Sequence, residues 1–396
     1  MMWLRNFLDH IAPYFDKGGR FAALYPVYEA IDTALYTPAT VTAGPSHVRD
    51  GLNLKRIMIT VWMCAFIPAL AGAYVTGFQA NEAMQTLGQT GIGNWRFWFV
   101  ELVAGYDPTS VWDCLVHGMA YYIPLYVVVF VVGIAFEAVF AAKRGHEINE
   151  GFFVTSILFT LTLPANTPLW MAAIGIVFGV VIGKEVFGGT GKNFLNPALV
   201  GRAFLYFAYP AQMSGDAVWV AVDGFTRATP LGAAAIGDDY GVTWIQAFLG
   251  NMPGSFGETS TLAILVAGAI LLATRIASWR IMAGCVLGTA FTVWAFNAIG
   301  STDNPMFAMT LPWHLVLGGY AFGVVFMATD PVSAAMTDAG RWAYGILIGF
   351  MCALIRVVNP AFPEGIMLAI LFGNLFAPLI DYYVVRANIK RRLARG

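Results

Sequence analysis

A glycine-rich stretch between two apolar segments carries side chains suited to hold a flat polar ligand. It spans residues 187–199 and contains Asn193 and Asn196, and Pro197 suits the first turn of a following helix. Its backbone N–H groups and two side-chain amides can bind a heteroaromatic ring or an anion. The stretch is not a P-loop, because it lacks the motif's first glycine and the hydroxyl residue after Lys192. A tight turn between two helices explains the same residues.

Three carboxylates lie within apolar segments or at their ends, where an unpaired charge is costly. Asp330, followed by Pro331, must face a cavity, a ligand or a partner rather than hydrocarbon. Glu137 and Asp381 lie near the predicted cytoplasmic boundary, and their oxygens make them candidates for a Na⁺ pathway. Pairing with a basic neighbour such as Arg386 is the alternative for both.

A polar loop over residues 213–260 carries a third group of candidates. They combine acidic, basic, hydroxyl and glycine residues: Asp223, Thr226, Arg227, Thr229, Gly257, Glu258 and Thr259. Two threonines three positions apart in a loop usually cap helices or stabilise turns. The residue types alone therefore do not predict a cofactor site in this loop.

The composition places these residues in a helical membrane protein. Of the 396 residues, 58% are apolar and only 11% are charged, and the mean hydropathy is +0.67. Apolar runs near twenty residues long indicate spanning helices rather than a β-barrel, whose strands alternate polar and apolar residues. The net charge of −1 provides no basic surplus for nucleic acid. The four cysteines lack metal-ligand spacing, so no iron–sulfur or zinc centre built by this chain is expected.

Ten apolar segments predict an all-α polytopic protein with about ten transmembrane helices. They are residues 57–78, 119–141, 152–165, 168–187, 195–212, 261–278, 281–299, 313–330, 342–358 and 365–383. Linkers rich in Lys and Arg should be cytoplasmic, which places both termini inside and the loop 213–260 outside. The predicted organisation is a cytoplasmic cap over 1–54 with a short amphipathic helix near 3–15, a membrane domain over 55–383, and a basic cytoplasmic tail over 384–396.

Two short, interrupted segments suggest an internal repeat of five helices. Residues 152–163 end in a segment with two prolines, and residues 323–329 end in Asp330-Pro331. The helix that follows each one carries a pair of glycines four positions apart: Gly175 with Gly179, and Gly345 with Gly349. Close-packed helices and broken half-helices near a binding site have this pattern. The alternative is that glycine and proline are simply common in membrane helices.

Seven motifs distributed over most of the chain resemble one protein family. They occupy residues 147–156, 184–191, 193–199, 201–204, 257–260, 328–333 and 388–392. Together they are similar to the B subunit of the bacterial Na⁺-translocating NADH:quinone oxidoreductases. The paralogous D subunit of the Rnf ferredoxin:NAD⁺ complex shares the glycine-rich and Thr-Asp-Pro patterns but generally lacks so long an N-terminal cap. Residues 1–54 therefore favour the quinone reductase.

The resemblance implies a covalent flavin in the outer loop. In this family FMN is joined by a phosphoester to the last Thr of a Ser/Thr-Gly-Ala-Thr motif, a position that falls on Thr229. Asp223 and Thr226 fit the motif, whereas Arg227 replaces the usual Gly, which puts recognition by the separate flavin transferase in question. Arg227 would partly balance the phosphate charge. We assign Gly257, Glu258 and Thr259 to the same cofactor site.

The resemblance also implies a noncovalent riboflavin and a ubiquinone site nearer the cytoplasm. Amides and a carboxylate can bond an isoalloxazine edge, so the riboflavin is expected at Asn193, Asn196 and Asp330. The quinone is expected on the helix face around Gly133 and Ile134, where a small residue leaves a groove. A glycine that only lets helices approach each other is the alternative.

The implied function is electron transfer from the outer FMN through riboflavin to ubiquinone, with a contribution to Na⁺ export. The implied protein is one of six subunits of a complex in the bacterial inner membrane. No G-x-G-x-x-G nicotinamide fingerprint is present, so a partner flavoprotein subunit must oxidise NADH. The alternatives are the Rnf D subunit and, from another class, a secondary transporter without flavin, for which broken helices are equally natural.

Overall fold

The computed structural model describes residues 2–16, 18–35, 54–89, 91, 93–145, 148, 150–215, 218–222, 225, 228–359 and 362–395, and their regular structure is entirely helical. Six helices are long and apolar enough to cross a membrane. They are α3 (Leu54–Leu87), α5 (Val111–Arg144), α7 (Leu169–Gly183) with the following turn η2 (Glu185–Phe187), α13 (Trp279–Ile299), α16 (Asp338–Val358) and α17 (Ile366–Leu393). The predicted class, an all-α polytopic membrane protein, is confirmed.

Three shorter apolar helices coincide with three further predicted segments: α6 (Gly151–Leu161), α8 (Pro197–Ala208) and α12 (Thr261–Ala273). The tenth predicted segment, 313–330, is not one continuous helix. It is divided into α14 (Leu311–Val316), α15 (Tyr320–Phe322) and the π-helical turn η4 (Gly323–Met327). The break follows from Gly318 and Gly319, whose φ angles of 63° and 67° lie in the left-handed region that a helix cannot include.

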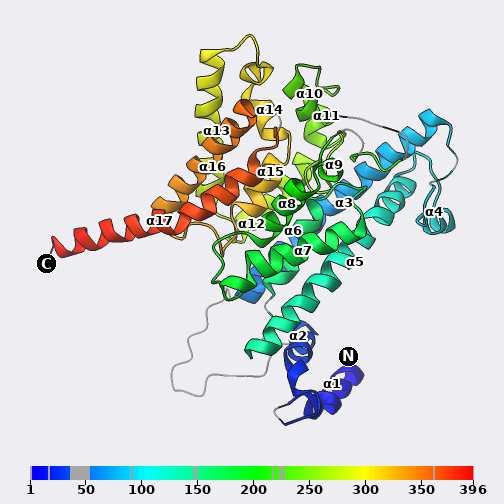
Figure 1. Ribbon diagram of the computed structural model, residues 1–396, viewed down its shortest axis with the longest axis vertical. Helices are drawn as coiled ribbons and strands as arrows, with labels where there is room; N and C mark the ends of the chain where they lie inside the picture. The colour runs from blue at the N-terminus through cyan, green and yellow to red at the C-terminus, as the bar shows by residue number, and fades with distance from the viewer. Residues whose placement is uncertain are drawn as a thin grey trace.

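Small helices cover the two ends of the bundle. They are α1 (Met2–Phe15), η1 (Ala22–Leu24), α2 (Tyr25–Leu35), α4 (Phe97–Val103), α9 (Pro210–Met213), α10 (Pro230–Ile236), α11 (Trp244–Leu249) and η3 (Pro305–Ala308). Figure 1 shows α10, α11 and α14 together at one end, with α1 and α2 at the other and the C-terminus of α17 projecting from the bundle. Helix α1 matches the amphipathic helix predicted near residues 3–15, and residues 36–53 of the predicted cap lie outside the described residues.

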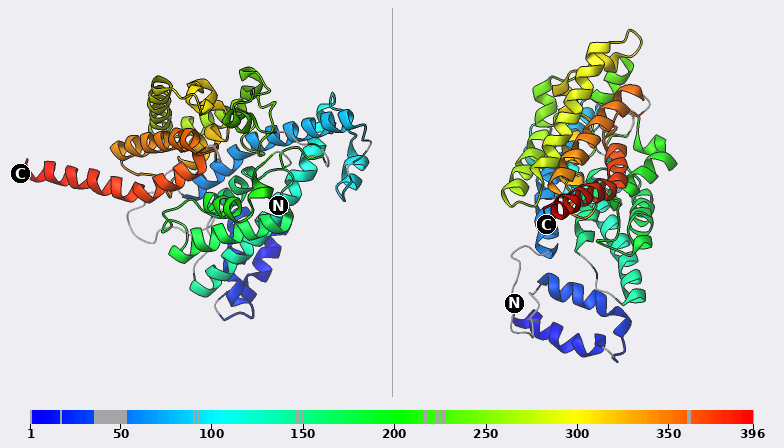
Figure 2. Two further views of the ribbon diagram at one scale, coloured as in Figure 1. Left: turned by 45° about the horizontal axis from the view of Figure 1, so that its top comes forward. Right: turned by 90° about the vertical axis from the view of Figure 1, so that its left-hand side faces the viewer.

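The two interrupted segments lie in the interior. Nine of the eleven α6 residues and all five residues of η4 are buried. Helix α6 contacts α3, α5, α7 and α8, whereas η4 contacts α12, α13, α15 and α17. Figure 2 shows the long helices surrounding this centre from two further directions. The short segments are therefore enclosed by longer helices, which supply the hydrophobic contacts that such short helices need.

Glycines bring the long helices into backbone contact at the predicted pairs. A Cβ atom at Gly349 or Gly345 of α16 would collide with a backbone carbonyl of α13. A Cβ atom at Gly179 of α7 would collide with the carbonyl of Pro197 on α8, and one at Gly175 with the Leu205 side chain of α8. These contacts confirm the close packing that the small-residue spacing predicts.

Candidate functional site

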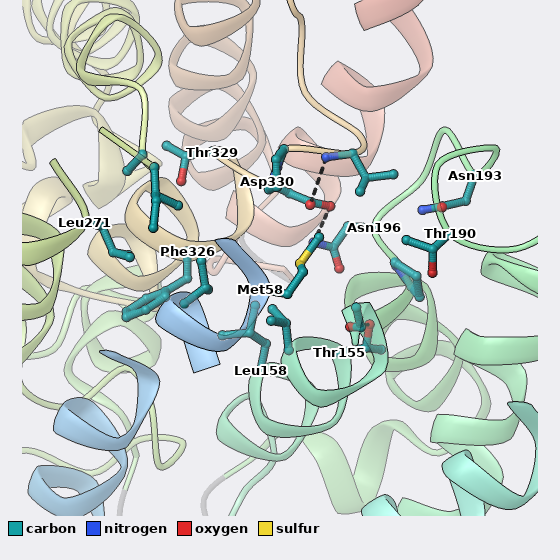
Figure 3. Close-up of a pocket in the computed structure, with 18 of the residues that line it drawn as sticks. Met58, Thr155, Leu158, Thr190, Asn193, Asn196, Leu271, Phe326, Thr329 and Asp330 are labelled. Carbon is teal, nitrogen blue, oxygen red and sulfur yellow. Dashed lines mark hydrogen bonds between the residues drawn. The ribbon is translucent and has the colours of Figure 1, made fainter. Parts of the chain in front are cut away.

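A pocket lies at the N-terminal end of α8 and contains all three side chains predicted to hold riboflavin. Asn193, Asn196 and Asp330 line it together with Met58 of α3, Thr155 and Leu158 of α6, Leu271 of α12 and Phe326 of η4. Lys184, which lies between α7 and η2, lines it as well. Figure 3 shows these side chains around the cavity, with Asn196 and Asp330 joined by a hydrogen bond. We call it the amide pocket. The fold thus unites residues 134 positions apart that the sequence predicts as one site.

The Asp330 carboxylate is held by neutral donors. It accepts hydrogen bonds from the Ser333 hydroxyl at 2.7 Å, the Val332 backbone N–H at 3.1 Å and the Asn196 Nδ2 at 3.4 Å. No basic side chain of the described residues forms an ion pair with it. A carboxylate bound in this way retains acceptor capacity for a ligand N–H or hydroxyl group.

Asn196 is fixed by bonds to its side chain and to its backbone. Its Oδ1 caps α8 by accepting from the Ala198 and Leu199 backbone N–H groups at 3.0 and 3.3 Å. Its own backbone N–H donates to the buried Asn374 amide oxygen at 3.1 Å, and the Asn374 nitrogen donates to the Tyr344 hydroxyl at 2.6 Å. The Nδ2 of Asn196 is therefore aimed at the pocket by a rigid support.

Asn193 has local partners that agree with the tight-turn interpretation. Its Oδ1 accepts from the Gly191 N–H at 3.3 Å and its Nδ2 donates to the Leu195 carbonyl at 2.9 Å. Gly188, Gly189 and Gly191 have backbone φ angles of 115°, 92° and 88°, which residues other than glycine rarely adopt. The glycine-rich stretch is thus a turn between two helices, and it also forms one wall of the amide pocket.

The polar groups of the amide pocket fit a flavin, but its enclosed space is small. The cavity measures about 40 Å³, room for roughly three water molecules at about 10–15 Å³ each. A tricyclic ring therefore requires side chains to move apart. Met58 extends toward Asn196 in Figure 3 and is the most adaptable of them, because it has three rotatable bonds.

A second pocket, of about 190 Å³, lies at the C-terminal end of α8. We call it the threonine pocket. It contains Thr229, together with the aromatic side chains Tyr206 and Trp219 and the carboxylates Glu258 and Glu364. The Thr229 hydroxyl caps α10 and accepts the Gly232 N–H at 3.1 Å. The two pockets thus lie at opposite ends of α8, whose 12 residues span about 18 Å.

Glu258 is a half-buried carboxylate that lines both the threonine pocket and a neighbouring interior cavity. Its Oε1 accepts the Ser255 backbone N–H at 2.7 Å. Burial raises the pKa of Glu258 to about 7, and the nearby Glu364 carboxylate adds to that increase. This carboxyl group can therefore change its charge near neutral pH.

A small middle cavity lies along α8 between the two pockets. Arg202, Glu258, Phe322 and Glu364 are among the residues that line it. Arg202 lies 3.9 Å from the Glu364 carboxylate, and its Nη1 is buried without a hydrogen-bond partner among the described residues. The sequence analysis did not include Arg202 among the candidate site residues, although an arginine inside an apolar helix is a usable signal of a polar site. For Glu364 in its short linker no comparable signal existed.

The other predicted flavin residues are separated or not described. Asp223, Thr226 and Arg227 lie outside the described residues. Gly257 packs against α6, where its backbone N–H donates to the Leu161 carbonyl at 2.8 Å. Thr259 is buried, and neither Gly257 nor Thr259 lines the threonine pocket. Of the predicted set in the described part of the chain, Thr229 and Glu258 meet at this pocket.

The predicted quinone face is packed against other helices. A Cβ atom at Gly133 would collide with the Phe152 ring of α6, and Ile134 is half-buried against the core. The same turn of α5 carries Glu137, whose carboxylate forms a buried ion pair with Lys184. Gly133 therefore lets two helices approach each other closely, and Glu137 pairs with a basic residue. These are the alternatives to a quinone site at Gly133 and to a Na⁺ site at Glu137.

Asp381, the other Na⁺ candidate, ties α17 to the start of α16. Its carboxylate accepts the Met336 and Thr337 backbone N–H groups at 2.6 and 3.0 Å. It also accepts the Thr337 hydroxyl at 2.5 Å. The side chain is half-buried, so this carboxylate has a structural function in joining the middle of α17 to the start of α16.

Known proteins match the chain over its whole length. A family model described as the NQR2, RnfD, RnfE family matches residues 41–390. A relative from Pseudomonas paraeruginosa, the B subunit of a Na(+)-translocating NADH-quinone reductase, is 63% identical over 404 residues with both chains fully covered. A protein of the same name from Azotobacter vinelandii is 62% identical over 402 residues, with both chains fully covered. One from Chromohalobacter salexigens is 61% identical over 399 residues, which cover this chain fully and 97% of the relative.

The fold and the pockets define a polytopic helical membrane protein with polar sites at both ends of an interior helix. The chain belongs to the NQR2, RnfD, RnfE family. Within that family its full-length similarity is to the B subunit of Na⁺-translocating NADH-quinone reductases, so the resemblance inferred from the motifs is confirmed.

Proposed function

We propose that this chain is the membrane subunit that carries electrons across a Na⁺-translocating NADH-quinone reductase, from an outer covalent FMN through riboflavin to ubiquinone. The full-length relatives bear the name of that complex. The observation that supports the electron path is the pair of polar pockets at opposite ends of α8. One contains Asn193, Asn196 and Asp330, which are expected to bind riboflavin, and the other contains Thr229 and Glu258 of the residues expected for FMN.

The threonine pocket suits an anchored FMN. Thr229 lines it with Tyr206 and Trp219, aromatic side chains that can contact a flat ring. A phosphoester to the Thr229 hydroxyl would retain the cofactor on a face where a dissociated flavin is lost, and the bound flavin supplies one-electron chemistry. Asp223, Thr226 and Arg227 are proposed as the local sequence that the flavin transferase recognises during maturation.

The amide pocket suits riboflavin once its side chains separate. Asn196 and Asp330 offer a donor and an acceptor to a ring edge or to ribityl hydroxyls. Burial of these groups excludes water, which strengthens each hydrogen bond to the ligand. Ubiquinone is proposed on the α5 face at Gly133 and Ile134, which requires displacement of the Phe152 ring.

The orientation follows from charge. Arg144, Lys184 and Arg280 lie near the ends of α5, α7 and α13 that the positive-inside rule assigns to the cytoplasm. The proposal places both termini in the cytoplasm of a bacterial inner-membrane complex of six subunits. Electrons would reach the threonine pocket from a flavoprotein partner, and Na⁺ would enter by way of Glu137 and Asp381.

Flavin content tests the amide pocket. In the purified complex, Asn196→Ser keeps a capping oxygen for α8 and Asp330→Asn keeps the side-chain shape, yet each weakens the bond between these two residues. We expect riboflavin retention to fall about tenfold, since a hydrogen bond to a charged group contributes about 1.5–3 kcal/mol. Extraction and chromatography of noncovalent flavin measures the loss.

Matched controls are Asn251→Ala and Asp303→Asn, which change exposed residues outside both pockets. They should retain riboflavin fully. Full retention in the Asn196→Ser, Asp330→Asn double variant would contradict the assignment. A chain that lacks both flavins while transporting a solute would instead support the secondary transporter, and electron exchange with ferredoxin would support the Rnf subunit.

A further inference from the structure

Four charges, three of them buried, form a neutral cluster beside the amide pocket. Lys184 forms an ion pair with Glu137 of α5, and its Nζ also lies 3.9 Å from Glu185 Oε1. Arg144 binds Glu185 through Nη1 to Oε2 at 3.0 Å and through Nη2 to the backbone carbonyl at 2.7 Å. The side chains of Lys184 and Glu137 are each 3% exposed. Two positive and two negative charges balance, as a low-dielectric environment requires.

Lys184 belongs to two sites at once. It lines the amide pocket with Asn193 and Asn196, and it pairs with Glu137 on the opposite side. It follows the last residue of α7, Gly183, where the helix gives way to the turn η2. A lysine ammonium is a compact charge on a flexible four-carbon stem, so it can move between two neighbouring acceptors without movement of the backbone.

We propose that Lys184 is an exchange cation that couples the charge in the amide pocket to Na⁺ binding at Glu137. When the pocket gains an electron, the Lys184 ammonium moves from Glu137 toward the pocket, and one Na⁺ replaces it at the Glu137 carboxylate. The proposal rests on the proposed function, because the electron comes from the flavin at Thr229. No covalent bond forms or breaks.

Charge balance fixes the stoichiometry. The four paired charges of the cluster cancel, and one electron added to the pocket makes the net charge of this water-poor interior more negative by one. One Na⁺ at Glu137 restores neutrality after Lys184 has moved away. Removal of the electron reverses both movements, because the ammonium returns to Glu137 and displaces the ion. Arg144 stays on Glu185, which keeps the second pair balanced throughout.

A static network is the competing explanation. In that case the four charges only join α5 to the end of α7, and Lys184 stays on Glu137 in every redox state. The two explanations differ in how the midpoint potential of the riboflavin depends on Na⁺. An exchange cation makes the potential rise with Na⁺ concentration, because the reduced form binds the ion more tightly. If the ion pair between Lys184 and Glu137 is static, Lys184 does not contribute to the dependence of the midpoint potential on Na⁺ concentration.

The test measures this potential spectroelectrochemically in the purified whole complex over a range of Na⁺ concentrations. Lys184→Gln removes the charge but can still bond Glu137, whereas Lys184→Arg keeps the charge. We expect Lys184→Gln to leave the Glu137 carboxylate accessible to Na⁺ in both redox states. Half-saturation of the Na⁺ site should then occur at about tenfold lower Na⁺ concentration, and the midpoint potential of the riboflavin should lose most of its Na⁺ dependence. Lys184→Arg should retain the dependence in part.

Lys192→Gln is the matched control, because its exposed side chain lies in the same turn and lines neither pocket. It should behave as the unaltered protein. An unchanged Na⁺ dependence in Lys184→Gln, with riboflavin bound, would overturn the exchange mechanism alone. Full riboflavin retention in the amide-pocket double variant would overturn the proposed function instead, so the two failures are distinguishable.

Discussion

Asp330 and Glu258 are acidic side chains at the two pockets that lie at opposite ends of α8. Asp330 is held by neutral hydrogen-bond donors at the amide pocket. Glu258 borders both the threonine pocket and the middle cavity and has Glu364 as a neighbour. A buried carboxylate without a strong cationic partner responds to any charge that enters nearby. At the scale of single residues, these carboxyl groups are the ones in the two pockets whose energy would change most if the proposed flavins were reduced.

Glu258 should make the stability of the protein depend on pH. Burial raises its pKa from 4.5 to about 7, so the folded state holds a proton that the unfolded state has released in this range. The stabilisation is complete below about pH 4.5 and is lost as pH rises through about 7. We expect the melting temperature to fall between about pH 4.5 and 7 and to level off above that range, and Glu258→Gln to remove that part of the decrease.

Differential scanning fluorimetry of the purified protein over this pH range measures the effect. Glu101→Gln is the control, because Glu101 is exposed on α4. Its pH profile should match that of the unaltered protein. Identical profiles for Glu258→Gln and the unaltered protein would show that Glu258 does not take up the proton.

At the scale of elements, glycines determine how closely the helices approach the site. Helix α16 lies against α13 through Gly345 and Gly349, and α7 lies against α8 through Gly175 and Gly179. The first contact supports Tyr344, which holds Asn374 and through it the backbone of Asn196. Helix packing is thus connected to the geometry of the amide pocket by a short chain of hydrogen bonds.

Gly349→Leu should separate α16 from α13. The added side chain would collide with the Cys285 carbonyl of α13, where no flexible atom can give way. Overpacking of this kind costs about 1–3 kcal/mol, so the melting temperature should fall and noncovalent flavin should be partly lost. Ile346→Leu, which changes an exposed residue of the same helix with little change in volume, is the control. Equal melting temperatures for the two variants would contradict the packing argument.

At the scale of the whole molecule, the sequence predicts the helices better than their contacts. Apolar runs indicate nine of the helical segments because spanning length and hydropathy are local properties. The amide pocket could also be predicted, since Asn196 and Asp330 each follow an apolar segment at a helix break. The pairing of Lys184 with Glu137 could not, because it depends on how α5 meets α7. The break at Gly318-Gly319 and the buried Arg202 had local signals that were usable.

The central claim is that two flavins are held at opposite ends of one interior helix, the outer one through Thr229. Peptide mapping by mass spectrometry of the purified, denatured chain tests it most directly, with Thr302→Ala, which changes an exposed threonine outside both pockets, as the control. We expect a fluorescent peptide that contains Thr229 and is heavier by FMN less one water, and we expect this peptide to disappear in Thr229→Ala. An unmodified Thr229 in a complex that still reduces quinone, or covalent FMN retained in Thr229→Ala, would contradict it.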